Sequence, residues 1–206
     1  RSRSWERFSS LCFVIASDGR ESQIPGPSAA PLCYEVFDIF GGNRMASPLF
    51  DLTGKVAVVT GSSKGIGKSI ALHLALQGAK VVVSSRKAPV CEETAAEIRK
   101  AGGDATVIPC NISQKEQCEN LIAETRRQLG PVDVLVCNAA TNPYYGPTEK
   151  MPDDVFMKIM QNNILSNIWL INLCLPDMRA KKDGSIMIVS SIGGVRASTV
   201  IGAYCI

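Results

Sequence analysis

Histidine and closely spaced cysteines are scarce in this sequence, which has one histidine and eight cysteines without a Cys-x-x-Cys pair. Zinc sites are built from clustered Cys and His side chains, so the sequence predicts no metal site. Cys137 and Cys174 stand within apolar runs, where a free thiol packs as a small hydrophobic group. Free cysteines indicate a reducing intracellular compartment, and we expect the cytoplasm, with a peroxisomal or mitochondrial location as the alternative.

Long apolar runs and a strong charge of one sign are missing as well. No stretch approaches the roughly 18 consecutive apolar residues of a membrane-spanning helix, so we expect no membrane span. The net charge is +3 and the basic residues are scattered, which gives no indication of a nucleic-acid partner. The 206 residues are 46% hydrophobic and 20% charged, a composition typical of one globular domain.

Regular patterning begins at Lys55. Residues 1–44 mix Ser, Pro and Gly with isolated apolar residues, so we predict an irregular or disordered N-terminal extension there. After Lys55, short apolar runs alternate with amphipathic stretches, which is typical of strand–helix–strand units around a parallel sheet. The predicted strands are 56–60, 80–84, 104–109, 132–137 and 185–190, and the predicted helices are 65–77, 90–101, 114–129 and 153–180. We expect the last helix to be kinked or to start late, with its end broken at Pro176.

Three glycines join the first predicted strand to the first predicted helix. They have the spacing Gly61-x-x-x-Gly65-x-Gly67 and follow Thr60 directly. Glycines let a turn approach a phosphate closely, and the free N–H groups at the start of the following helix face the anion. Glycines also serve turns without any ligand, so the position between a strand and a helix is what favours a dinucleotide site.

This loop resembles the Thr-Gly-x-x-x-Gly-x-Gly motif of the classical short-chain dehydrogenase/reductase family, and the resemblance covers about residues 50–206. It implies an α/β fold, a Rossmann-type doubly wound parallel sheet over a domain at residues 45–206. It also implies a nicotinamide dinucleotide held at the loop, with cofactor-binding residues Gly61, Ser63, Lys64, Gly65, Ile66 and Gly67.

The end of the second predicted strand indicates which dinucleotide is bound. An acidic residue there accepts the ribose 2′-hydroxyl of NAD, whereas a nearby cation accommodates the 2′-phosphate of NADP. Ser85 stands where family members that use NAD carry the acid, Arg86 follows it, and Lys64 adds a second positive charge. We therefore predict NADP(H), the alternative being that Arg86 and Lys87 are solvated loop charges.

Later motifs match the family in order. Asn111 and Ile112 match the Asp-Val pair at the adenine ring, with Asn in place of Asp. Asn138 and Ala139 match the Asn-Asn-Ala-Gly element that steadies the sheet beside the cofactor. Residues 82–87 and 141–146 are similar to the NADPH-dependent carbonyl reductase and retinol dehydrogenase branch, which implies hydride transfer to or from a carbonyl or secondary alcohol.

The resemblance also supplies three catalytic residues: Asn163, chosen over Asn162, Ser191 and Tyr204. In the family, the Asn positions a water, the Ser hydrogen-bonds the substrate oxygen and the Tyr donates the proton. The structural alternatives are a helix bend at Asn163, a turn at Ser191 and a packing role for Tyr204.

The family carries a lysine four residues after the catalytic tyrosine, which here would be position 208, whereas the sequence ends at Ile206. We therefore expect a C-terminally truncated enzyme with a sheet incomplete at its C-terminal edge, inactive as it stands, from a parent that forms homodimers or homotetramers. Two alternatives remain: a catalytically inactive nucleotide-binding or interaction module, and a 3-ketoacyl carrier-protein reductase.

Overall fold

A computed structural model describes residues 50–196 and 200–205, so the predicted N-terminal extension lies outside the described residues. Within them the chain forms a parallel five-stranded sheet in the order β3-β2-β1-β4-β5. The chain steps outward from β1 in one direction and then returns to build the other half, which confirms the predicted Rossmann-type doubly wound sheet. The strands are β1 Val56–Thr60, β2 Lys80–Ser84, β3 Asp104–Val107, β4 Val134–Cys137 and β5 Ser185–Ile188.

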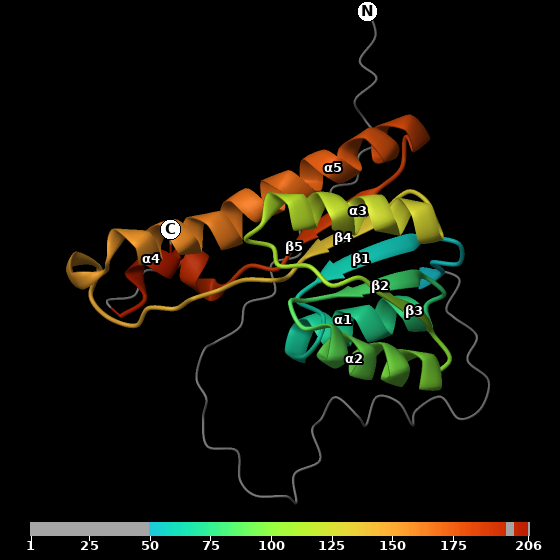
Figure 1. Ribbon diagram of the computed structural model, residues 1–206, viewed down its shortest axis with the longest axis horizontal. Helices are drawn as coiled ribbons and strands as arrows, with labels where there is room; N and C mark the ends of the chain where they lie inside the picture. Colours follow the sequence, from blue (N-terminus) through green and yellow to red (C-terminus); the bar gives the residue numbers. More distant parts are fainter. Residues whose placement is uncertain (1–49, 197–199, 206) are drawn as a thin grey trace, which may run out of the picture.

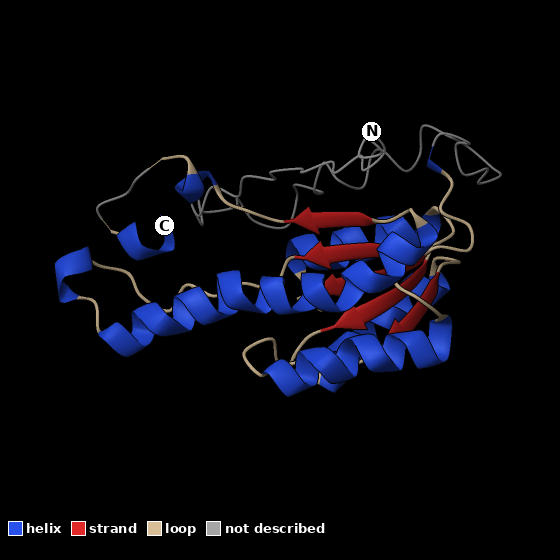
Figure 2. Cartoon of the chain, turned by 90° about the horizontal axis from the view of Figure 1, so that it is seen from above, coloured by secondary structure: helices blue, strands red, loops and turns tan. Residues whose placement is uncertain are grey.

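Helices cover both faces of the sheet (Figures 1 and 2). Helices α1 and α2 lie on one face, and α3 and α5 lie on the other. This layering follows from the crossover connections, because each strand is joined to the next parallel strand of the chain through a helix. The covering helices are α1 Gly65–Leu76, α2 Ala88–Lys100, α3 Lys115–Leu129 and α5 Ser166–Lys181, with α4 Asp153–Met160 preceding α5.

The core has two apolar layers, one on each side of the sheet. Successive strand side chains point to opposite faces, so Val59 packs toward α1 and α2 whereas Val58 packs toward α3 and α5. Cys137 and Cys174 are both buried in the second layer. Burial raises the pKa of each thiol from 9.0 to about 12.

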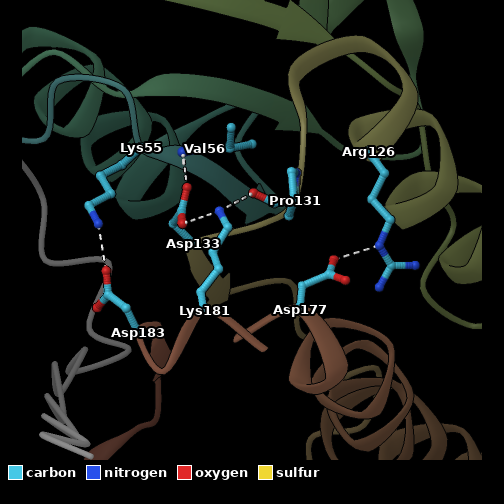
Figure 3. Close-up of polar contacts among 8 residues, drawn as sticks. All are labelled: Lys55, Val56, Arg126, Pro131, Asp133, Asp177, Lys181 and Asp183. Carbon is cyan, nitrogen blue, oxygen red and sulfur yellow. Dashed lines mark hydrogen bonds and ion pairs between the residues drawn. The ribbon is translucent and has the colours of Figure 1, made fainter. Parts of the chain in front are cut away.

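Ion pairs gather where the strands begin (Figure 3). The Asp133 carboxylate accepts hydrogen bonds from the Val56 N–H at 2.9 Å and from Lys181 Nζ at 2.7 Å. Lys55 Nζ lies 2.6 Å from Asp183. These contacts join the starts of β1 and β4 to the segment that links α5 to β5, and so fix how the strands are aligned at their amino ends.

The predicted helix at 153–180 is in fact two α-helices joined by a π-helical turn. Helix α4 ends at Met160, the π-turn η4 covers Gln161–Leu165, and α5 continues to Lys181. The three form one long rod that extends past the sheet (Figure 2). The expected break near Pro176 was wrong, since α5 continues through this residue to Lys181. A proline removes only one backbone hydrogen-bond donor, and α5 packs against α3 both before and after Pro176.

Three strands are shorter than predicted. Strand β3 ends at Val107 rather than at residue 109, β4 begins at Val134 rather than at 132, and β5 ends at Ile188 rather than at 190. The apolar pattern marks buried residues such as Val132, whose burial does not depend on strand pairing. Over the residues that the structure places, no helix is both long and apolar enough to cross a membrane.

Candidate functional site

A cavity of about 780 Å³ opens at the carboxyl ends of β1 to β4. It lies where the strand order reverses beside β1, the position at which open α/β sheets bind ligands. The cavity is lined by the glycine loop, the segments that follow β2, β3 and β4, and one face of α4 with its π-turn. Its lining residues are Gly61, Ser63–Gly67, Ser84–Lys87, Val90, Cys110–Ile112, Asn138–Thr141, Lys158 and Asn162.

The glycine loop needs its glycines. Gly61 and Gly65 have φ angles of +66° and +57°, in the left-handed region that glycine adopts without strain. A Cβ on Gly67 would lie 2.5 Å from the Gly61 carbonyl oxygen, closer than nonbonded atoms approach. Helix α1 begins here, and Lys64 at its N-cap makes no side-chain cap. The loop therefore presents backbone N–H groups suited to a phosphate, as the sequence predicts.

Thr60 and Asn138 fix the loop to β4. Asn138 Nδ2 donates to the Thr60 carbonyl at 2.9 Å and to the Gly61 carbonyl at 3.2 Å. Thr60 Oγ1 in turn accepts from the N–H groups of Asn138 and Ala139 at 3.0 and 3.1 Å. Asn138 and Ala139 line the cavity, so they shape its floor and hold the glycine loop above β4.

The segment after β2 is tied to the glycine loop. The Ser84 N–H donates to Ser62 Oγ at 2.8 Å, and the Ser62 N–H donates to the Ser84 carbonyl at 3.1 Å. Ser85 stands beside the cavity with its hydroxyl 3.1 Å from Cys91 Sγ. Arg86 and Lys87 follow it along the cavity wall, so the charges predicted for the cofactor ribose lie at the cavity.

Asn111 and Ile112 line the cavity at the end of β3. Asn111 Oδ1 accepts two hydrogen bonds from Ser113, from its N–H at 3.2 Å and from its hydroxyl at 2.9 Å. An amide oxygen has two lone pairs, so this acceptor is already engaged within the loop. Asn111 therefore lies at the cavity, while its side-chain oxygen is used within the loop.

Asn163 is placed to hold a loop. It lies in the π-turn, and its side chain pairs with the Thr141 backbone in the loop after β4. Its carbonyl accepts a 2.7 Å hydrogen bond from Asn167 Nδ2. It is Asn162, one residue earlier, that lines the cavity.

Ser191 and Tyr204 meet around Gly193. Ser191 Oγ accepts from the Gly193 N–H at 3.1 Å. The place that a Cβ on Gly193 would occupy is 3.5 Å from both Ser191 Oγ and Tyr204 Cδ1. Ser191 is the N-cap of the short helix η5 Ile192–Gly194, and Tyr204 lies in the short helix η6 Gly202–Cys205. The structure brings these two predicted residues together, although neither lines the 780 Å³ cavity.

Sequence reasoning missed Lys158 and Asn162, which stand one helical turn apart on the cavity wall. Their i, i+4 spacing on an amphipathic helix was the available signal, although it does not say which face a ligand meets. Among the described residues, no three His, Cys, Asp or Glu side chains come close enough to hold a metal ion.

The sheet order, the glycine loop and the cavity beside it define a Rossmann-type α/β domain. A family model for the short chain dehydrogenases matches residues 55–206. The chain belongs to the short-chain dehydrogenase/reductase family, which confirms the resemblance that its motifs indicate.

Curated relatives are similar along most of the chain. Dehydrogenase/reductase SDR family member 4 of Sus scrofa is 38% identical over 153 residues, which are 74% of this chain and 55% of the relative. Human dehydrogenase/reductase SDR family member 2, mitochondrial, is 37% identical over 165 residues, 78% of this chain and 59% of the relative. The chain thus spans a little over half the length of these relatives.

Solved structures share the fold. A 7 alpha-hydroxysteroid dehydrogenase complexed with NADH and 7-oxo glycochenodeoxycholic acid is 32% identical, with a TM-score of 0.72 over 76% of this chain and 60% of that one. A metagenomic short-chain oxidoreductase in complex with NADP is 33% identical, with a TM-score of 0.72 over 75% and 70%. Family members therefore hold either nicotinamide dinucleotide.

Proposed function

We propose that this chain binds NADP(H), and that the protein to which it belongs transfers a hydride between NADP(H) and a carbonyl or secondary alcohol. One observation carries the choice of NADP(H). The cavity wall includes four cations and, among the described residues that line it, no carboxylate; the cations are Lys64, Arg86, Lys87 and Lys158. A dinucleotide with a third phosphate is the ligand that such a charge balance favours.

Arg86 is the cation best suited to the ribose 2′-phosphate. It lies two residues after the end of β2, beside Ser85, which stands where an acid would accept the 2′-hydroxyl of NAD. Its planar guanidinium can donate two parallel hydrogen bonds to a phosphate, which an ammonium group cannot do. Ser85, at the acid position, is neutral and leaves the phosphate unopposed.

The chemistry of the proposed reaction divides between cofactor and protein. Bound NADPH would supply the hydride, and the chain's own groups would orient the substrate and provide a proton. Ser191 Oγ and the Tyr204 ring both lie beside Gly193, so we assign Ser191 a hydrogen bond to the substrate oxygen and assign Tyr204 the proton donor role. Asn163 positions the loop after β4, which begins at the cavity wall.

A titration with NADPH and NADH, followed by cofactor fluorescence, tests the proposal on the 206-residue protein. We expect NADPH to bind at least about tenfold more tightly, and Arg86→Ala to remove most of that preference. Lys100→Ala is the matched control, because Lys100 is exposed at the far end of α2. Equal or tighter binding of NADH by the wild-type protein would contradict the NADP(H) proposal.

For the 206-residue polypeptide we further propose binding with negligible turnover. In the family pattern a lysine four residues after the tyrosine favours the tyrosinate, and a polypeptide of residues 1–206 tested by itself does not include that position. NADPH oxidation with a panel of ketones and aldehydes should therefore stay at the background rate, while NADPH binding persists. Robust turnover would refute the proposal of negligible turnover. If NADPH does not bind either, the alternative of a catalytically inactive nucleotide-binding module would be refuted as well.

We also propose that the full protein is a homo-oligomer in a reducing intracellular compartment. Exposed apolar side chains along α4, η4 and α5, namely Met157, Ile164, Leu165 and Ile168, support self-association. The six cysteines within the described residues are free, which supports the compartment. Light scattering of the purified protein tests the proposed homo-oligomer, and a monomer at micromolar concentration would contradict self-association.

A further inference from the structure

Thr94 of helix α2 donates its hydroxyl to the glycine loop rather than to its own helix. The residue is 1% exposed, and its Oγ1 donates to the Ser63 carbonyl at 3.0 Å. A buried threonine hydroxyl in a helix ordinarily donates to the carbonyl four residues earlier, as Thr125 Oγ1 does to Leu121 at 2.7 Å. The hydroxyl of Thr94 therefore serves the cavity wall, to which Ser63 belongs.

This hydrogen bond fixes the peptide that leads into Lys64. The Ser63–Lys64 peptide is trans and planar, so a carbonyl held against α2 also fixes the position of the Lys64 Cα and the direction in which its side chain leaves the loop. The nearby Lys68 is paired with Glu97 of α2 at 2.5 Å, whereas Lys64 has no carboxylate partner within residues 50–196 and 200–205. Lys64 is thus a cation that is positioned at the cavity without being neutralised there.

Helix α2 holds the segment after β2 in the same way. That segment lies beside the glycine loop, to which it is hydrogen-bonded. The Ser85 hydroxyl lies 3.1 Å from Cys91 Sγ, and Cys91 precedes Thr94 by three residues, which places both side chains on one face of α2. One helix face therefore holds two joined segments, of which one carries Lys64 and the other carries Arg86.

We propose that Thr94 is a positioning residue for the third phosphate of NADP(H), and that it acts by holding Lys64 in place beside the segment of Arg86. Two cations serve one phosphate best when their spacing is set before the ligand arrives, because less freedom is then lost on binding. The inference rests on the proposed binding of NADP(H). It adds to that proposal a residue that stands behind the cavity wall and contacts no ligand itself.

The ratio of the NADPH and NADH affinities of the 206-residue protein, measured by fluorescence titration, tests this role. Thr94→Val removes the hydroxyl and should lower the ratio about fivefold, the effect of one lost hydrogen bond. Thr94→Ser keeps the hydroxyl and should keep the ratio of the wild-type protein. Thr125→Val is the matched control, because it removes an equally buried hydroxyl that donates within α3.

A purely structural role for Thr94 gives a different result. A less stable protein has a smaller folded fraction, which weakens the binding of both dinucleotides by the same factor and leaves the ratio unchanged. Thr94→Ala removes the same hydroxyl with a residue of high helix propensity, and it should lower the ratio as Thr94→Val does. In a Lys64→Ala background, Thr94→Val should have no further effect on the ratio, because the cation that Thr94 positions is gone.

The outcomes separate this inference from the proposed cofactor. If the wild-type protein prefers NADPH, and Thr94→Val and Thr94→Ala keep that preference, NADP(H) binding stands and the role of Thr94 is overturned. The role is also overturned if Thr125→Val lowers the ratio as much as Thr94→Val. If the wild-type protein has no preference for NADPH, the proposed cofactor is wrong and this inference is wrong with it. Circular dichroism and thermal melting show whether each variant is folded.

Discussion

Asn163 and Thr141 are joined by two hydrogen bonds. The Thr141 N–H donates to Asn163 Oδ1 at 2.8 Å, and Asn163 Nδ2 donates to the Thr141 carbonyl at 2.9 Å. An asparagine side chain offers an acceptor and a donor, so it binds this peptide much as a neighbouring strand would. The π-turn and the loop after β4 are thereby held as one unit at the cavity.

Replacing Asn163 with Leu should release that loop. Two hydrogen bonds are lost, each worth about 1 kcal/mol, so we expect faster amide exchange at residues 140–143 and roughly tenfold weaker NADPH binding. Hydrogen exchange and a fluorescence titration measure the two effects. Asn172→Leu, an exposed position on α5, is the control. Unchanged exchange at Thr141 would show that other contacts hold the loop.

A single methyl group at Gly67 should damage the cofactor loop. Its Cβ would lie 2.5 Å from the Gly61 carbonyl oxygen, so Gly67→Ala must displace the loop despite the better helix propensity of alanine. We expect a loss of about 1–3 kcal/mol in the free energy of unfolding, and weak or absent NADPH binding. Gly194→Ala should be tolerated, because the nearest atom to its Cβ lies 3.6 Å away. Normal binding by Gly67→Ala would show that the loop is not rigid.

The ion pairs at the beginning of the strands should differ widely in their contributions to stability. Asp133 is 6% exposed and satisfies the Val56 N–H as well as Lys181, so Asp133→Ala should cost about 3 kcal/mol. Asp183 is exposed, and Asp183→Ala should cost about 0–1 kcal/mol. Urea unfolding measures both. NADPH affinity should not change in Asp183→Ala, because the cavity lies at the opposite, carboxyl ends of the strands. Equal losses of unfolding free energy in the two variants would contradict this ranking.

The buried thiols should make the protein less stable in alkali. Burial raises the pKa of Cys174 from 9.0 to about 12, so between these values the folded state keeps a proton that the unfolded state has lost. The unfolded state then binds fewer protons, and the free energy of unfolding falls as the pH rises through this window. In Cys174→Ala the stability at pH 7 should be lower, and the decline between about pH 9 and 10.5 should be shallower. Cys205→Ala, half-buried, serves as the control; parallel pH curves for wild type and Cys174→Ala would contradict the prediction.

The half of the site that lies close together in sequence could be predicted from sequence. Strand β1, the glycine loop and α1 are consecutive, and their chemistry depends on local backbone geometry that glycine spacing reports directly. The place of Arg86 on the cavity wall was predictable for a similar reason, because the carboxyl end of β2 borders the crevice in this type of sheet. The parallel sheet followed from the alternation of short apolar runs and helices, whereas its Rossmann-type order was expected from the family resemblance.

The far wall of the cavity could not be predicted, since it depends on how a distant helix is turned. Lys158 and Asn162 face the cavity because the π-turn follows α4, and apolar periodicity does not report such a turn. The engagement of Asn111 by Ser113 is likewise a detail of side-chain rotamers. The meeting of Ser191 and Tyr204 around Gly193 was expected from family resemblance rather than from any local pattern.

The π-turn at Gln161–Leu165 changes which way the side chains of α4 face relative to those of α5. Each residue advances an α-helix by about 100°, so one residue more in a turn rotates everything before it relative to everything after it. Helix α4 can therefore present Lys158 to the cavity while α5 presents Leu170 to the core. Deleting one residue within the turn would straighten the helix and swing one of these faces away, so ligand contact and core packing could not both survive a change in length here.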